Sequence, residues 1–112
     1  SVIESVTIRL ISSGMLKSPE RIPPSTWATS IFNFLAAMEQ AKAVVSQAKG
    51  FQVIHVHRGV EKPSTYLIAI GWDTVEDHMV GFRESDLFTQ WRGLIGPFFA
   101  NPPEVTHWEL QA

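Results

Sequence analysis

Two histidines close together are the first residues of this sequence with the means to carry out chemistry. His55 and His57 stand one residue apart in the segment GFQVIHVHRGVE, residues 50–61, and Glu61 follows them. The apolar residues around them indicate a β-strand, in which alternate side chains point to the same face. Both imidazoles therefore share a face, as half of a metal site, as a proton-transferring pair, or as two half-buried strand residues.

The metal interpretation rests on a partial motif. Two histidines one residue apart, with a glutamate shortly after, resemble the first metal-binding motif of the cupins, whose imidazole and carboxylate ligands suit iron, zinc or manganese. The second cupin motif is missing from residues 93–112, and a long helix is predicted before the histidines, whereas cupins are all-β barrels. We therefore expect no metal site.

Two further side chains, His78 and Tyr66, are candidates for proton transfer. His78 lies in a predicted helix, where it is either a surface residue or, in an apolar pocket, a group that takes and delivers a proton near pH 7. Tyr66 is the only tyrosine, and its hydroxyl needs a partner, either in the core or on a ligand carbonyl or enolate. The predicted catalytic set is therefore His78, His57 and Tyr66.

Aromatic residues suggest a cavity for a flat molecule. The chain has four tryptophans and seven phenylalanines, and core packing accounts for most of them. The side chains predicted to line a substrate pocket are Trp27, Phe34, Met38, His55, Trp72, Phe82, Trp91 and His107. Arg58 and Arg83 either pair with Glu61 and Glu84 or bind an anionic substrate.

Four strands and a long helix must position these groups. Alternation of apolar and polar residues predicts strands over residues 2–11, 51–58, 64–72 and 102–110. Apolar residues at three- and four-residue steps predict a helix over 26–49. A proline-containing loop precedes this helix, and Ser25 or Thr26 is predicted to cap it.

The segment after the third strand is predicted to form two short helices. Thr74 and Asp77, three residues apart, fit a capping box at the start of the first one. Ser85 is predicted to cap the second helix, which Gly96 and Pro97 end. The order of elements is then βαββαβ with the second α divided in two.

This order is that of a ferredoxin-like α+β fold, a four-stranded antiparallel sheet of order 4-1-3-2 with helices on one face. The 112 residues suffice for one domain, residues 1–112. The other sheet face needs cover, and the chain has no element left to provide it. We therefore predict a homodimer whose sheets pack face to face, as a dimeric α/β barrel.

The register of the central hairpin decides where the two histidines point. A symmetric turn centred near Glu61 pairs Val56 with Tyr66 and places the histidines on the face of Leu67 and Ala69. A slip of one residue moves every side chain of the strand to the other face, beside the helices. The sequence leaves both registers open.

Composition excludes several classes of partner. The formal net charge is −2, so neither nucleic acid nor an anionic membrane surface is an expected partner. No apolar run approaches the roughly 20 residues of a membrane span. The absence of cysteine suits a reducing compartment, and we expect a cytoplasmic protein.

Residues 50–91 resemble the antibiotic biosynthesis monooxygenase (ABM) family of dimeric α+β barrels. The resemblance is carried by Gly50 before the hairpin, Arg58 and Glu61 near its turn, Trp72 at the end of the third strand, Glu76 and His78 in the next helix, and the run FRESDLF after them. It implies a homodimer with a small, mostly apolar pocket between sheet and helices, often without a cofactor.

The resemblance also implies a class of reaction. Some members oxygenate aromatic polyketides, and some related barrels cyclise them. A haem-degrading branch uses an asparagine on its first strand, which this chain lacks, so haem degradation is not expected. We favour an enzyme over a non-catalytic protein: a cofactor-independent monooxygenase that acts on a small aromatic or polyketide-like substrate by histidine-assisted proton transfer. The alternatives are a polyketide cyclase or isomerase, and a dimeric small-molecule-binding or stress-response module.

Overall fold

A computed structural model describes residues 2–10 and 24–111, and it places the side chains of 2–10 and 32–111. The elements follow in the order β1 (Val2–Arg9), α1 (Pro24–Val45), β2 (Phe51–Arg58), β3 (Thr65–Trp72), the π-helix η3 (Asp77–Phe82), α2 (Asp86–Ile95), the 3-10 helix η4 (Gly96–Phe98) and β4 (Glu104–Glu109). The predicted βαββαβ order is confirmed.

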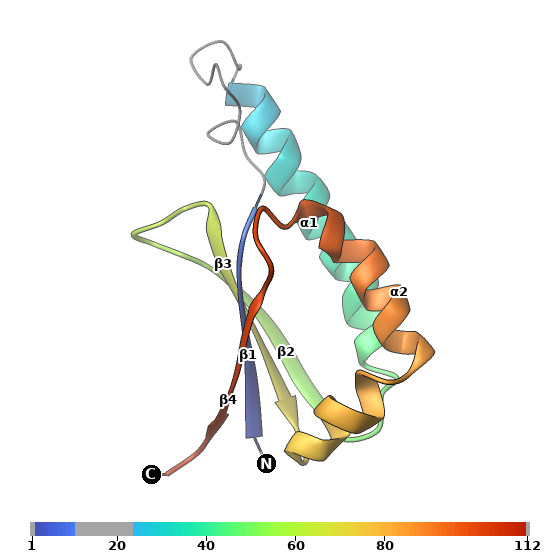
Figure 1. Ribbon diagram of the computed structural model, residues 1–112. Helices are drawn as coiled ribbons and strands as arrows, with labels where there is room; N and C mark the ends of the chain where they lie inside the picture. Colours follow the sequence, from blue (N-terminus) through green and yellow to red (C-terminus); the bar gives the residue numbers. More distant parts are fainter. Residues whose placement is uncertain (1, 11–23, 112) are drawn as a thin grey trace.

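The four strands form one antiparallel sheet of order β2-β3-β1-β4. This is the predicted ferredoxin-like order, read from the other edge. Both α1 and α2 lie on the same side of the sheet (Figure 1). Within the described part of the chain, no helix has both the length and the apolar composition needed to cross a membrane.

The core lies between α1 and the helix-facing side of β1 and β3. Val6 and Ile8 of β1 and Leu10 just after it are the buried apolar residues, each two residues apart. The other members of the core include Phe34, Met38, Ala41 and Val45 from α1, and Tyr66, Ile68, Ile70 and Trp72 from β3. Alternation on the strands and helical spacing on α1 therefore define one continuous core.

The ends of α1 differ from the prediction. The helix begins at Pro24, so Ser25 and Thr26 lie in its first turn and neither is its cap. It ends at Val45, before Lys49, where the Ser46 hydroxyl donates a 2.9 Å hydrogen bond to the carbonyl of Ala43. Such side-chain bonds to the last helical carbonyls compete with continuation of the helix.

The hairpin register places both strand histidines away from the helices. His55 pairs with Ala69 and His57 with Leu67, on the open face of the sheet. Val56 pairs with Ile68, so the pairing with Tyr66 expected for a symmetric turn is wrong by two residues. The last hydrogen bond before the β2–β3 turn joins the Gly59 N–H to the Thr65 carbonyl over 2.7 Å. A shift of two residues preserves the face, which a shift of one would reverse.

The open face of the sheet carries apolar side chains that no helix of residues 24–111 covers. Ile3, Leu67 and Trp108 are 41%, 37% and 62% exposed, and Val53 on β2 is 40% exposed. Ile3 pairs with Trp108 across β1 and β4, so the apolar side chains extend over all four strands.

Candidate active site

A glutamate stands at the centre of the candidate site. Glu4 belongs to the same alternating series of β1 as Val6 and Ile8, so it faces the helices. It pairs with Ile70 on β3 and with His107 on β4, and it is only 4% exposed. A carboxylate in this position needs hydrogen-bond partners to offset the loss of hydration.

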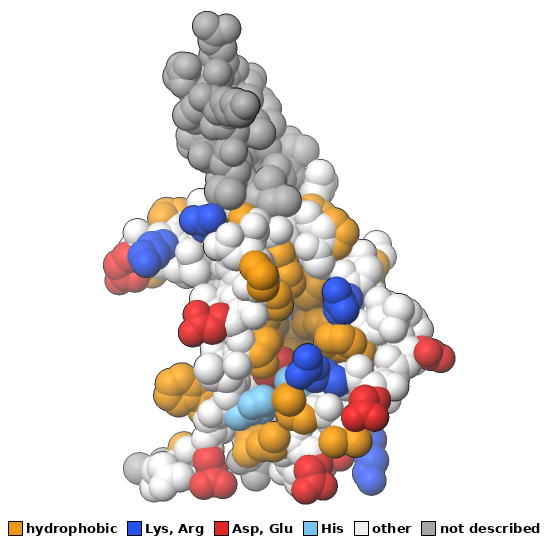
Figure 2. Space-filling view, viewed as in Figure 1, with side chains coloured by type: hydrophobic (Ala, Val, Ile, Leu, Met, Phe, Trp, Pro, Cys, Tyr) orange, Lys and Arg blue, Asp and Glu red, His pale blue; other side chains and the backbone are white. Residues whose placement is uncertain are grey.

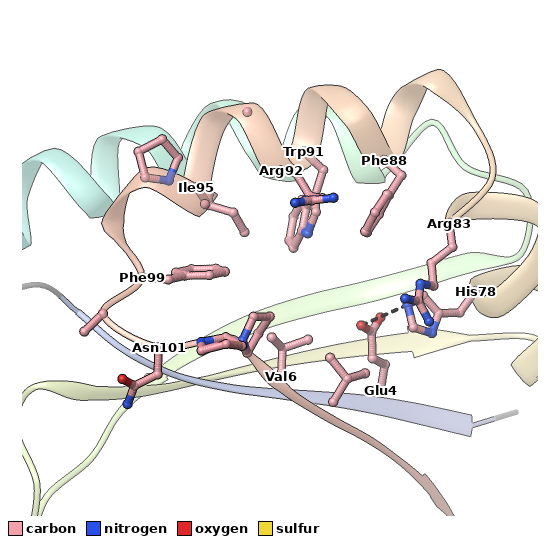
Figure 3. A pocket seen from close by; sticks show the side chains of 17 residues that line it. Glu4, Val6, His78, Arg83, Phe88, Trp91, Arg92, Ile95, Phe99 and Asn101 are labelled. Atoms are coloured by element: carbon pink, nitrogen blue, oxygen red, sulfur yellow. Dashed lines mark ion pairs between the residues drawn. The ribbon is translucent and has the colours of Figure 1, made fainter.

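Three neighbouring elements supply those partners. Trp72 at the end of β3 donates its indole N–H to Glu4 Oε1 over 2.9 Å. His78 Nε2 lies 3.0 Å from Glu4 Oε2, an ion pair drawn in Figure 3. His78 Nδ1 lies 2.8 Å from His107 Nε2. Trp72, Glu4, His78 and His107 thus form a chain of hydrogen bonds, which we call the Glu4 relay.

The donors and acceptors of the Glu4 relay follow from the charge of its carboxylate. An ionised Glu4 only accepts hydrogen bonds, so His78 Nε2 must carry a proton. In a neutral His78, Nδ1 then accepts from His107 Nε2–H, and in a charged His78 it donates to His107. In both states His78 connects the buried carboxylate to the half-buried His107 by hydrogen bonds from its two ring nitrogens.

His107 favours its neutral form. Burial lowers the pKa of this imidazole from its ordinary value of 6.5, the neighbouring His78 lowers it further, and Glu4 raises it. Loss of hydration disfavours the charged ring, which is why burial acts in this direction. The same shift makes His107 a weaker base than a free imidazole, so this ring is neutral near pH 7.

A π-helix turns His78 toward Glu4. The capping contact expected at Thr74 is confirmed, since Thr74 Oγ1 accepts the Asp77 N–H over 3.1 Å. In η3 the Arg83 N–H donates to the His78 carbonyl five residues back, at 3.0 Å. The buried residues of this segment are His78 and Phe82, and the His78 ring stacks on Trp72 with ring centroids 5.6 Å apart. π-Helical turns of this kind often occur at functional sites.

Gly50 allows η3 to approach the sheet. Its φ is +84°, a backbone region that favours glycine, and a Cβ built there would lie 2.2 Å from the Asp77 carboxylate. Because Asp77 directly precedes His78, this close contact helps to hold the histidine over the sheet.

The Glu4 relay borders a pocket of about 980 Å³ between α2 and the β1–β4 half of the sheet. Phe88, Trp91, Arg92 and Ile95 recur on one face of α2 and form one wall, visible above the strands in Figure 3. The facing wall includes Val6 of β1 and Val105 of β4, which are partners in the sheet.

Charged groups are gathered at one part of this pocket. Figure 2 shows hydrophobic side chains in the hollow, with histidine, acidic and basic side chains around its lower part. The charged lining residues are Glu4, Arg83 and Arg92, and His78 lines the same space. Within residues 2–10 and 24–111 no group of three or more His, Cys, Asp or Glu side chains is arranged to hold a metal.

Comparison with known proteins agrees with this architecture. The family model described as "Antibiotic biosynthesis monooxygenase" matches residues 33–94. The chain belongs to the ABM family. The predicted resemblance is thereby confirmed, and the matched range contains Trp72, His78 and three residues of the α2 wall, Phe88, Trp91 and Arg92. Glu4 and His107 lie outside it.

Individual proteins and solved structures are also similar to this chain. An uncharacterized protein YczJ of Bacillus subtilis is 33% identical over 68% of this chain and 80% of its own length. A crystal structure of a putative antibiotic biosynthesis monooxygenase from Bordetella bronchiseptica is 30% identical, with a TM-score of 0.79 over 99% of this chain and 97% of that one. A monooxygenase from the gene ActVA-Orf6 of Streptomyces coelicolor, in complex with Nanaomycin D, has a TM-score of 0.71 at 13% identity and covers 99% of this chain and 88% of its own.

The structure brings several of the predicted site residues together in this ABM fold. His78 and Trp91 line the pocket. Trp72 and His107 belong to the Glu4 relay, and Phe82 packs against Trp72 with ring centroids 5.5 Å apart.

Other predicted residues lie elsewhere. Tyr66, Phe34 and Met38 belong to the core beneath α1, where the rings of Phe34 and Tyr66 are 5.2 Å apart. His55 and His57 are exposed on the open sheet face, so they do not line the pocket beside α2. The side chain of Trp27 lies outside the described ones.

Sequence reasoning missed Glu4, although a signal for it was present. This glutamate continues the alternating series of Val6, Ile8 and Leu10, so it falls on the buried face of a predicted strand. Sequence reasoning also missed Phe88 and Arg92, which line the pocket from α2. Arg83 was noted as a possible ligand for an anion.

Proposed function

We propose that this ABM family protein is a cofactor-independent monooxygenase that oxidises an acidic C–H position of a small aromatic, polyketide-like substrate. The observation that carries the proposal is the Glu4 relay at the edge of an aromatic pocket. Buried titratable groups linked by hydrogen bonds within a pocket are typical of proton-transfer sites.

The Glu4 carboxylate is the proposed acceptor of the substrate proton. Its two oxygens each accept one hydrogen bond, from Trp72 and from His78, which leaves further lone pairs for a ligand. Both nitrogens of His78 are already engaged, with Glu4 and with His107. His78 therefore assists by stabilising the Glu4 carboxylate through its Nε2–H, while the contact of its Nδ1 with His107 holds the ring in place.

The reaction balances without a reductant. Loss of a C–H proton gives an aromatic enolate, which transfers an electron to oxygen and then combines with the resulting superoxide. Return of the proton gives a hydroperoxide, and loss of water from it gives the carbonyl, so that R₂CH₂ + O₂ becomes R₂C=O + H₂O. The substrate supplies the electrons and oxygen is reduced, while the Glu4 relay takes up and returns a proton.

The size and lining of the pocket suit a fused aromatic substrate. Small-molecule pockets commonly measure about 300–1,000 Å³, and this one, at about 980 Å³, is at the upper end. Phe88, Trp91 and Phe99 supply flat apolar surfaces along it. Aromatic rings stack on such surfaces, which favours a fused aromatic ligand.

We further propose that the single domain expected over residues 1–112 acts as a homodimer. The open face with Ile3, Leu67 and Trp108 exposes apolar side chains that a second copy would bury. Packing of two such sheets face to face would yield a dimeric barrel, and in it His55 and His57 would lie near the seam.

Oxygen uptake with a hydroxyanthrone tests the proposed reaction, because its CH₂ group is acidic and its product is a quinone. With EDTA present and no flavin or nicotinamide added, the protein should consume one O₂ per quinone formed, above the rate in buffer. His78→Gln should reduce this rate by about 10²-fold or more. His57→Gln, which changes an imidazole on the open face, should retain the rate.

The outcome separates the alternatives. Turnover to an isomer or a cyclised product without oxygen uptake would favour the cyclase or isomerase. An oxidation rate no higher than in buffer, or full activity of a folded His78→Gln, would overturn the proposed monooxygenase.

A further inference from the structure

Two arginines at the pocket are not explained by proton transfer. Arg83, which follows η3, and Arg92 on α2 both line the pocket. Among the residues that the structure describes, neither guanidinium forms an ion pair. Arg92 lies over the Phe88 ring, 5.9 Å from its centroid, and Arg83 Nη1 is 3.9 Å from the sulfur of Met79.

The charges around the pocket favour an anion. The carboxylate of Glu4 is already compensated by the Trp72 N–H and by His78, whereas the two guanidinium groups have no carboxylate partner among the described residues. The whole chain has a formal net charge of −2, so a positive pocket is a local feature and does not reflect the composition of the chain.

The positions of the arginines complement the aromatic wall. In Figure 3, Arg83 lies at the His78 end of the pocket, and Arg92 extends from α2 beside Trp91 and Phe88. Contact with the Phe88 ring limits the freedom of the Arg92 side chain, so less entropy is lost when it binds a ligand. A planar guanidinium matches the two oxygens of a carboxylate, which a lysine ammonium does not.

We infer that the ligand of this pocket is a fused aromatic carboxylic acid, with its rings on Phe88 and Trp91 and its carboxylate bound by Arg83 and Arg92. This inference rests on the proposed function for the identity of the pocket as the substrate site. The inference goes beyond the proposed function because it assigns to the substrate a carboxylate, which oxidation of a C–H position does not require.

A matched pair of probes tests the inference without turnover. Anthraquinone-2-carboxylate and its methyl ester have the same ring system and differ in charge, and quenching of tryptophan fluorescence reports their binding. The acid should bind about tenfold more tightly than the ester, as is reasonable for partly solvated charge-assisted hydrogen bonds. The preference should decrease as sodium chloride is added.

Variants assign the preference to the two arginines. Arg83→Met and Arg92→Met keep an apolar stem, and each should weaken binding of the acid about threefold to fivefold while the ester is unaffected. Lys62→Gln, which removes a positive charge in the β2–β3 turn away from the pocket, is the control and should change neither affinity. Equal affinity for acid and ester, binding of neither, or an equal loss for both in the arginine variants would overturn the inference.

The test is separable from that of the proposed function. A preference for the acid without oxygen uptake would overturn the monooxygenase and leave the anion site intact. Oxidation of a hydroxyanthrone acid and its ester at equal kcat/KM, together with equal affinity for the two quinones, would overturn the anion site and leave the monooxygenase intact.

Discussion

Substitution of Glu4 by glutamine and by alanine separates the charge of this side chain from its hydrogen bonds. Glutamine has nearly the same shape, and its amide oxygen still accepts the Trp72 N–H that now lies 2.9 Å from Glu4 Oε1. Its NH₂ group faces His78 Nε2, so His78 must become an acceptor there and donate from Nδ1 to His107. We expect a loss of about 1–2 kcal/mol in the free energy of unfolding, as a charge-assisted bond becomes neutral.

Alanine removes both bonds. Trp72 is 0% exposed and His78 is 3% exposed, so both lose a protein partner at a position with little contact to water. Each unpaired buried group costs about 1–3 kcal/mol, so Glu4→Ala should lose about 2–6 kcal/mol. That is a large part of the roughly 5–15 kcal/mol that stabilises a typical domain.

Urea unfolding followed by circular dichroism measures both losses, and oxygen uptake measures the catalytic effect. Glu4→Gln should remain folded and lose about 10²–10⁴-fold in kcat, because an amide does not accept the substrate proton. By NMR titration, the pKa of His107 should fall further in this variant, since Glu4 is the group that raises it. A Gln variant with activity within a few-fold of the parent, or an Ala variant as stable as the Gln variant, would refute the reasoning.

Three further perturbations test other parts of the structure. Burial depresses the pKa of His107 in the folded protein, so the unfolded chain binds more protons as the pH falls below the ordinary value of 6.5. The free energy of unfolding should therefore decrease below that pH. In urea unfolding at several pH values, His107→Gln should flatten this dependence. Gly50→Ala, at φ +84° and with a Cβ against the Asp77 carboxylate, should lower the free energy of unfolding by about 1–3 kcal/mol. The control Gly93→Ala, where a Cβ meets nothing within 4 Å, should raise it by about 0.5–1 kcal/mol. Equal effects of the two substitutions would contradict the role given to Gly50. Leu67→Glu on the open face should convert the proposed dimer to a monomer in light scattering at micromolar concentration, and a monomeric parent protein would show that the second copy is not needed.

The limits of sequence reasoning are clearest in the hairpin and in β1. Alternation correctly identified β2 and β3, yet it left the face of His55 and His57 open, because one residue of slip exchanges the two faces. The length of the turn between Gly59 and Thr65 settled that question. On β1 the same alternation places Glu4 on the buried face, but it does not indicate which side chains bond to this carboxylate.

The sequence by itself determined the elements, their order and the ferredoxin-like sheet, because strand and helix periods are local properties of the chain. It also marked His78, Trp72, Trp91 and His107 as site residues. Only the tertiary structure decided that Trp72 and His78 bond to Glu4 and that His107 bonds to His78, since Trp72 lies 68 residues from Glu4 and His107 lies 29 residues from His78. Contacts across such separations depend on strand pairing and on the turn of η3, which local patterns do not specify.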